Sequence, residues 1–205
     1  MKFFIPISFA LFVIMVLCTG CKSKAFPTPM ANKKPLIIDI RPFNDMPSPD
    51  QQALFGSLKK IYPHVVLKPA VALPASAYFP ARNRYRADSL ISFLRKITTE
   101  GHISIGITTK DISTTKGKYA DWGIMGLGYS PGLSCVASSY RLADNKKTTQ
   151  LYKVAIHELG HTQGLPHCPD KGCFMRDAEG KNVLDEESYF CSSCKKVLHA
   201  KGFPF

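Results

Sequence analysis

Apolar residues in the first half of the chain gather in short blocks whose spacing alternates between strand and helix. The β-branched block at residues 36–40 predicts a strand, and so does the block at residues 64–67. Between them, Ser48-Pro49-Asp50 predicts a helix start, because proline fits the first helical turn and an acid is favourable there. That helix would end at Tyr62-Pro63. Its predicted buried face consists of Leu54, Leu58 and Ile61.

The second half of the chain continues the alternation. Apolar residues at helical spacing over residues 90–97 predict a helix that stops at Gly101. Residues 102–108, 122–129 and 134–140 predict strands. The glycine-rich middle one, WGIMGLGY, is typical of a strand that another backbone or a ligand approaches closely. Because strands and helices are mixed along the chain, we predict the α+β class.

The length of the chain limits the number of domains, and its charge limits the kinds of partner. A chain of 205 residues has room for one domain with a real core. The formal net charge is +12, yet the lysines are scattered in ones and twos without a long basic run. We interpret the charge as a solvated basic surface, with salt-sensitive binding of acidic lipid or polymer as the alternative. No nucleic-acid partner is expected.

The N-terminus carries a pattern of its own. A lysine precedes an almost unbroken apolar stretch that is short for a transmembrane helix. We interpret residues 1–21 as a signal peptide ending in a lipobox whose Cys21 becomes lipid-modified, although Cys18 replaces the usual aliphatic residue. Ordinary secretion and an uncleaved anchor are the alternatives. Residues 22–35 would form a tether and residues 36–205 the domain of an exported, membrane-anchored bacterial lipoprotein.

The motif HELGHTQGLPHC begins near the end of a helix predicted over residues 148–163. Residues four apart lie on one face of a helix, so His157 and His161 can offer two imidazole nitrogens to one ion. Glu158 points along a different bearing, from which it can reach a water on that ion. The helix would bury Leu151, Val154, Ala155 and Leu159.

The residues after this helix supply a third ligand. Gly164 can take the positive φ of a chain reversal and Pro166 prevents helix continuation, so His167 has a route back to the metal. Catalytic zinc commonly has three protein ligands and an open position for water. Glu158 would accept that water's proton and pass it to the departing amine. Two half-buried helix histidines without a metal are the alternative, but five defined positions in one register favour catalytic zinc.

Seven cysteines are present, and four of them, from the last residue of the motif onward, form two close pairs. Cys168 and Cys173 form one pair, and Cys191 and Cys194 form a CxxC. Such pairs suit a structural zinc held by four thiolates, whereas export to an oxidising compartment would favour disulfides. Both possibilities stay open from spacing alone. Cys135 is interpreted as a small buried residue and not as a nucleophile.

These residues together resemble the archaemetzincin, or archaelysin, family. The resemblance rests on HELGHTQGLPHC, on Cys173-Phe174-Met175 and on the CxxC at residues 191–194. It extends to TTKDI at residues 108–112, to WGIMGLGY and to SSYRL at residues 138–142. It therefore covers most of the chain beyond the leader.

The resemblance implies a zincin-like metzincin fold: a twisted mixed sheet, an active-site helix and a small cysteine-rich C-terminal subdomain. It implies that His157, His161 and His167 bind catalytic zinc and that Glu158 is the base. It also implies that the four cysteines bind a second, structural zinc and that Met175 forms the hydrophobic floor of a Met-turn. WGIMGLGY would be an edge strand along which a peptide substrate adds as a further strand.

The predicted function is zinc-dependent hydrolysis of peptide bonds by a monomer acting on peptides or proteins. One alternative is a zinc-binding but catalytically silent peptide- or protein-binding module, which would retain every ligand. The other is a basic adhesion or nucleic-acid module with purely structural zinc, which would bind in a strongly salt-dependent way.

Overall fold

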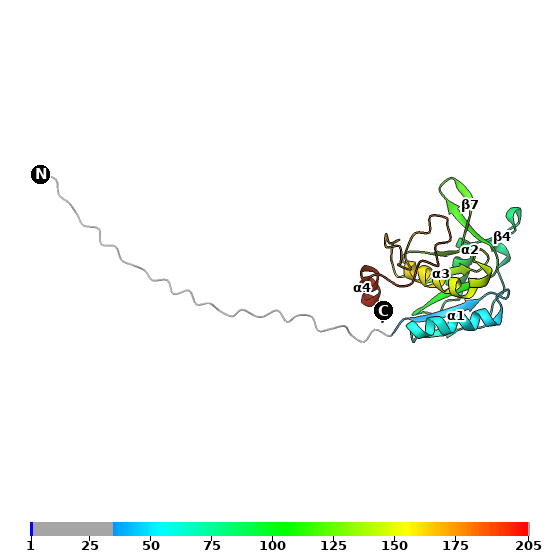
Figure 1. Cartoon of the computed structure of the whole chain (residues 1–205), viewed down its shortest axis with the longest axis horizontal. Helices are drawn as coiled ribbons and strands as arrows, with labels where there is room; N and C mark the ends of the chain where they lie inside the picture. Colours follow the sequence, from blue (N-terminus) through cyan, green and yellow to red (C-terminus); the bar gives the residue numbers. More distant parts are fainter. Residues whose placement is uncertain (2–34, 205) are drawn as a thin grey trace. The chain divides into compact units, whose positions relative to one another are not determined.

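The computed structural model describes residue 1 and residues 35–204 (Figure 1). The predicted leader with Cys21, and the tether apart from its last residue, lie outside the described residues. Within the described part, no helix is both long and apolar enough to cross a membrane.

The central sheet has five strands in the order β2-β1-β5-β9-β8. These are β1 (Ile37–Pro42), β2 (Val65–Leu67), β5 (His102–Thr108), β8 (Gly126–Gly128) and β9 (Ser134–Ser138). All neighbours are parallel except β8, which runs antiparallel to β9 at the edge of the sheet. The sheet is therefore mixed, with its antiparallel strand at one edge.

A second sheet of four short strands has the order β3-β4-β6-β7. They are β3 (Tyr78–Phe79), β4 (Arg84–Arg86), β6 (Ile112–Lys116) and β7 (Tyr119–Ile124). Single-turn 3-10 helices lie at Ala75–Ala77, Pro80–Arg82 and Asp144–Lys146. Apart from the part of β7 that belongs to residues 122–129, this sheet was not predicted, because β3 and β4 are only two and three residues long and show no clear alternation.

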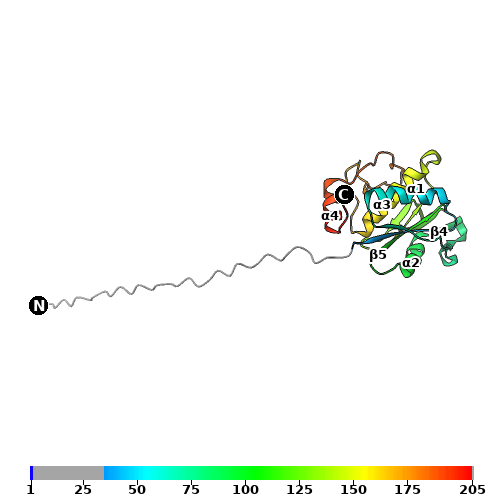
Figure 2. The ribbon, with the colours of Figure 1, turned by 90° about the horizontal axis from the view of Figure 1, so that it is seen from below.

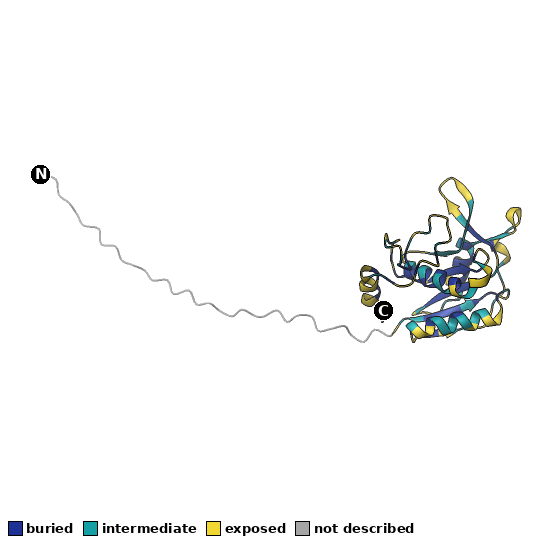
Figure 3. Ribbon diagram, in the orientation of Figure 1, coloured by how far each residue is buried: buried dark blue, intermediate teal, exposed yellow. Residues whose placement is uncertain are grey.

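Four α-helices complete the fold: α1 (Ser48–Ile61), α2 (Ala87–Ile97), α3 (Lys147–Thr162) and α4 (Ser192–Ala200). Figure 2 shows α1 and α3 on one face of the central sheet and α2 on the other. Because helices cover both faces, β5 and β9 are buried almost throughout, and the side chains of β9 alternate between two hydrophobic cores. Figure 3 shows the buried residues along the sheet and the inward sides of the helices.

The predicted helices and strands agree with the structure within a few residues, with one informative difference. Residues 122–129, predicted as one strand, are divided at Met125 into β7 and β8. The two parts pair with different partners, β7 with β6 and β8 with β9, so the chain passes from one sheet to the other. The carbonyl of Met125 accepts a hydrogen bond from the Ser138 N–H across this step.

Between α3 and α4 the chain has no regular helix or strand, only turns and two isolated bridges. These bridges join Cys168 to Arg176 and Cys173 to Tyr189. Helix α4 packs on the main core through Cys194 and Leu198. This segment and α4 form the predicted small C-terminal region.

Candidate active site and cysteine cluster

Helix α3 and the turn after it bring three histidine rings together. His157 and His161 lie one turn apart, with ring centroids separated by 4.7 Å. Directly after the helix, Gly164 takes a φ of +88°, as predicted, and the chain reverses. The ring of His167 then lies 5.4 Å from that of His157 and 4.9 Å from that of His161. We call these three residues the histidine cluster.

Each ring of the histidine cluster is held through its Nδ1 atom. His157 Nδ1 donates to the Phe174 carbonyl at 2.6 Å, and His161 Nδ1 donates to the Leu165 carbonyl at 2.8 Å. His167 Nδ1 lies 3.3 Å from Asp177 Oδ2. A carbonyl oxygen can only accept, so the first two rings carry their proton on Nδ1 when neutral. Their Nε2 atoms are thereby left as ligands.

The spacing of these nitrogens fits a bound cation. The Nε2 atoms of His157 and His161 are 3.0 Å apart, and two bare lone pairs at that distance repel unless a proton or metal lies between them. One nitrogen of each of the three rings lies within 4.8 Å of the others. Tetrahedral zinc with Zn–N bonds of about 2.0–2.1 Å places its ligands about 3.4 Å apart. Neutral imidazole nitrogens at this spacing suit zinc.

Burial keeps two of these rings neutral. It lowers the pKa of His157 to about 3, and the neighbouring His161 adds to the shift. It also lowers the pKa of His161. Because only the neutral ring can bind a metal, both are ready to do so at pH values below the ordinary histidine pKa.

Glu158 lies beneath the glycine-rich edge strand β8. It is buried, and burial raises the pKa of its carboxyl to about 8, while a hydrogen bond with the Gly128 backbone opposes that shift. A Cβ atom on Gly126 would lie 2.5 Å from Glu158 Oε1, so only glycine lets β8 come this close. A cation held by the histidine cluster would favour the ionised carboxylate.

Met175 packs under α3, where the sequence analysis placed the floor of the site. It is fully buried, and a Cβ atom on Gly160 would lie 2.3 Å from its Sδ atom. The glycine of HELGH therefore provides the space that Met175 fills. The Met175 carbonyl also accepts a hydrogen bond from the Cys168 N–H at 2.7 Å.

A cavity of about 650 Å³ opens over the histidine cluster and Glu158. Its lining includes residues 122–128 of β7 and β8, residues 176–178 and 180–182 after Met175, and Glu187. An open cavity that contains both a three-nitrogen cluster and a buried carboxylate can hold a substrate carbonyl and a water beside a metal.

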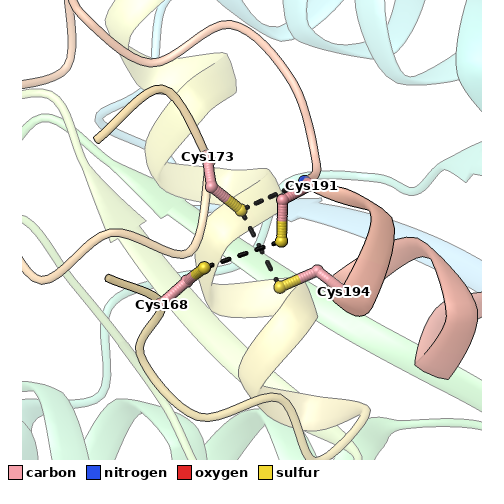
Figure 4. A group of neighbouring side chains, drawn as sticks. All are labelled: Cys168, Cys173, Cys191 and Cys194. Atoms are coloured by element: carbon pink, nitrogen blue, oxygen red, sulfur yellow. Dashed lines mark hydrogen bonds between the residues drawn. The ribbon is translucent and has the colours of Figure 1, made fainter. Parts of the chain in front are cut away.

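The four C-terminal cysteines form a second cluster, shown in Figure 4. Cys168 Sγ lies 3.6 Å from Cys191 Sγ, and Cys173 Sγ lies 3.8 Å from Cys194 Sγ. None of the four forms a disulfide in the structure. Zinc bound to four thiolates at about 2.3 Å would hold its sulfurs about 3.8 Å apart, so the cysteine cluster fits zinc. The backbone of Cys194, at the start of α4, lowers the pKa of Cys191.

The two clusters share short pieces of chain. Cys168 directly follows His167, and Cys173 directly precedes Phe174, whose carbonyl holds His157. The rings of His157 and His167 are therefore positioned by pieces of chain that directly adjoin the cysteine cluster.

Two acids on the cavity wall were missed by the sequence analysis. Asp177 follows Met175 by two residues, and that proximity to a motif was a usable signal. Glu187 sits in irregular chain without any motif, so only folding brings it to the cavity. Cys135 lies buried in β9, and burial raises the pKa of its thiol well above the ordinary value, as expected of a small core residue.

The fold and the site together define a class, the zinc metallopeptidases with a zincin-like fold. Within that class, the model of Peptidase family M54 matches residues 52–200, and the chain belongs to this family. It is thus a zinc metallopeptidase and acts on peptides.

Individual relatives and solved structures support the same family and fold. The archaemetzincin of Halobacterium salinarum is 31% identical over 175 residues, which cover 78% of this chain and 98% of the relative. The crystal structure of the Methanopyrus kandleri archaemetzincin matches with a TM-score of 0.71 and 27% identity, covering 82% of this chain and 95% of that one. The Archaeoglobus fulgidus archaemetzincin, solved with malonate, matches with a TM-score of 0.67 and 27% identity, covering 78% and 98%. The predicted family and fold are confirmed.

Proposed function

We propose that this metallopeptidase cleaves peptide bonds at the histidine cluster, with His157, His161 and His167 holding one zinc ion and Glu158 acting as general base. The observation that carries the proposal is the convergence of three ring nitrogens within 4.8 Å beside a buried carboxylate in one cavity. Neutral imidazoles with engaged Nδ1 atoms can turn their Nε2 atoms to the ion.

Zinc in that position supplies a Lewis acid that polarises the substrate carbonyl and makes water more acidic. Glu158 takes a proton from the attacking water and later delivers it to the departing amine. A carboxyl whose pKa lies at about 8 without a cation, and lower with one, can accept and release a proton near neutral pH.

The substrate peptide would lie along the edge strands that line the cavity. Strand β8 ends the order of the central sheet, and β7 ends that of the second sheet. Each can therefore offer backbone N–H and C=O groups to an extended peptide. Gly126 and Gly128 keep β8 within contact of Glu158, so a peptide paired there would have a carbonyl near the site.

The cysteine cluster would bind a second zinc ion, which gives two ions per chain. Its four sulfurs would supply all the ligands that structural zinc commonly takes and leave no position for water, so this ion would stabilise the fold. It would tie the start of α4 to the segment that carries Met175 and the Phe174 carbonyl.

For the N-terminus, the proposal rests on sequence alone. Residues 1–21 would direct export and lipid modification of Cys21, residues 22–35 would be a tether, and residues 36–205 would act as a monomeric domain outside the cytoplasm. Cells grown with labelled fatty acid should give a labelled wild-type protein and an unlabelled Cys21→Ala variant. A Cys21→Ala protein that is still processed and labelled would contradict the lipid anchor.

Digestion of a peptide library tests the proposed hydrolysis. The zinc-loaded wild-type protein should cleave peptides, and a chelator or the substitution Glu158→Ala should stop the cleavage. If Glu158→Ala cleaves as fast as wild type, the proposed base is wrong. If the zinc-loaded wild type binds peptides but cleaves none, the protein is the catalytically silent module.

A further inference from the structure

Glu187 is a buried acid on the cavity wall that the proposed hydrolysis leaves without a role. It is only 1% exposed, and it lines the cavity that contains Glu158 and the histidine cluster. Its Oε2 atom has no hydrogen-bond partner among the described residues. A buried carboxylate is unfavourable unless a cation or a hydrogen-bond donor joins it.

No basic group among the described residues forms an ion pair with the Glu187 carboxylate. Two such groups, Lys153 and Arg176, act on Glu187 electrostatically. The Lys153 ammonium donates to the Leu184 carbonyl at 2.6 Å, and Arg176 donates to Glu186 at 2.6 Å. Burial consequently raises the pKa of Glu187 to about 7 although both cations lower it.

The backbone holds Glu187 in place. Its N–H donates to the Leu184 carbonyl at 3.3 Å, and the next residue, Ser188, donates to the Gly172 carbonyl at 2.9 Å. Four residues further on, Cys191 joins the cysteine cluster. The side chain is therefore presented from a fixed turn, which limits its escape to solvent.

We propose that Glu187 determines specificity by accepting the ammonium or guanidinium group of a substrate lysine or arginine near the scissile bond. This inference rests on the proposed function. Val154 and Leu184 line the same cavity and can contact the methylene groups of such a side chain. Because one cavity of about 650 Å³ contains both Glu187 and the histidine cluster, the side chain that reaches Glu187 belongs to a residue close to the cut.

The test uses peptides that differ only by lysine or norleucine at single positions around the cut. Wild type should prefer lysine at one position by roughly 10- to 100-fold in kcat/KM, the range for a hydrogen bond to a charged group. Glu187→Gln keeps the shape and removes the charge, so the preference should fall to within about threefold. The norleucine peptide should be cleaved at about the wild-type rate, which also shows that the variant is folded.

Glu179→Gln is a matched control. Glu179 is exposed in the same segment, does not line the cavity and makes no ion pair among the described residues. This variant should keep the full lysine preference. A lysine preference that is absent in wild type, or unchanged in Glu187→Gln, would overturn the inference.

Two further arms separate this inference from the proposed function. Acetyl-lysine in place of lysine removes the charge without changing the protein, and it should be cleaved as slowly as norleucine. Cleavage of the acetyl-lysine peptide as fast as the lysine peptide would overturn the inference. Binding is measured by fluorescence anisotropy with zinc-loaded Glu158→Ala. Preferential binding of lysine peptides without cleavage by wild type would contradict hydrolysis alone, whereas cleavage without a lysine preference would contradict the role of Glu187 alone.

Discussion

The histidine cluster and the cysteine cluster lie within one short stretch of sequence yet differ in ligand number and access. The three histidines open into a cavity beside a buried carboxylate, and the His167 side chain is 47% exposed. No cysteine of the other cluster lines that cavity, and Cys173 and Cys194 are buried. A cluster with three ligands leaves a position for chemistry, whereas four thiolates close the shell and contribute to folding.

The two clusters also differ in how far each depends on the other. The cysteines lie in the segment that supplies the Phe174 carbonyl to His157 and directly after His167, and a zinc ion bound to them would fix both pieces of chain. The histidine cluster lies at the end of a helix already packed in the main core. We therefore expect damage at the cysteines to reach the histidines, and not the reverse.

The largest expected effect separates the two clusters directly. His161→Ala should lose one zinc ion and all measurable peptidase activity, because two histidines hold zinc weakly, while the fold is retained. Cys194→Ser should lose both ions and the cooperative unfolding of the C-terminal region, since structural zinc contributes to folding itself. Zinc content and thermal unfolding of both variants check this. Equal loss of stability in the two would contradict the proposed division of roles.

The next largest expected effect concerns the Glu158 carboxylate beside the histidine cluster. Glu158→Gln should retain both zinc ions and the wild-type stability, while kcat falls by roughly 10²- to 10⁴-fold, the range for general acid–base catalysis. Steady-state kinetics with zinc analysis of the same sample provide the measurement. A variant that loses zinc together with activity would make Glu158 a ligand instead of a base.

The sequence predicts those parts of the fold and site that depend on residues close together in the chain, and it misses those that depend on distant partners. The histidine cluster follows from local rules: a helical repeat of four and a glycine and a proline after it. Met125 shows the limit, because the division of WGIMGLGY between two sheets depends on partners far along the chain. Glu187 is the clearest gap, since its burial beside the cavity comes from tertiary packing and no local pattern marks it.

Glu187, on the cavity wall, should also make the stability of the protein depend on pH. The folded pKa of Glu187, about 7, lies above the ordinary value of 4.5, so the folded protein binds the extra proton between these values. The free energy of unfolding should fall as pH rises through this window, by at most about 3 kcal/mol, and then level off. Glu187→Gln should remove this part of the decrease. Urea unfolding at several pH values in the His161→Ala background, which keeps the zinc of the cysteine cluster, measures this decrease, with Glu179→Gln as control. Identical slopes in all three proteins would contradict the assignment.

The smallest expected effect concerns the third histidine. Asp177 lies 3.3 Å from His167 Nδ1 and is half exposed, so it orients that ring only moderately. Asp177→Ala should weaken zinc binding at the histidine cluster by roughly 10- to 100-fold, and Asp177→Asn, which keeps an oxygen acceptor, by less. Competition with a chelator measures the affinity. An unchanged affinity in Asp177→Ala would show that His167 needs no partner on Nδ1.

The most direct test of the account is an anomalous difference map recorded at the zinc edge from crystals of the zinc-loaded protein. We predict two peaks per chain, one bonded to an Nε2 atom of each of His157, His161 and His167 and one at the centre of the four cysteine sulfurs. A map without density among the three histidines, or with the ring of His167 turned away from it, would contradict the central claim.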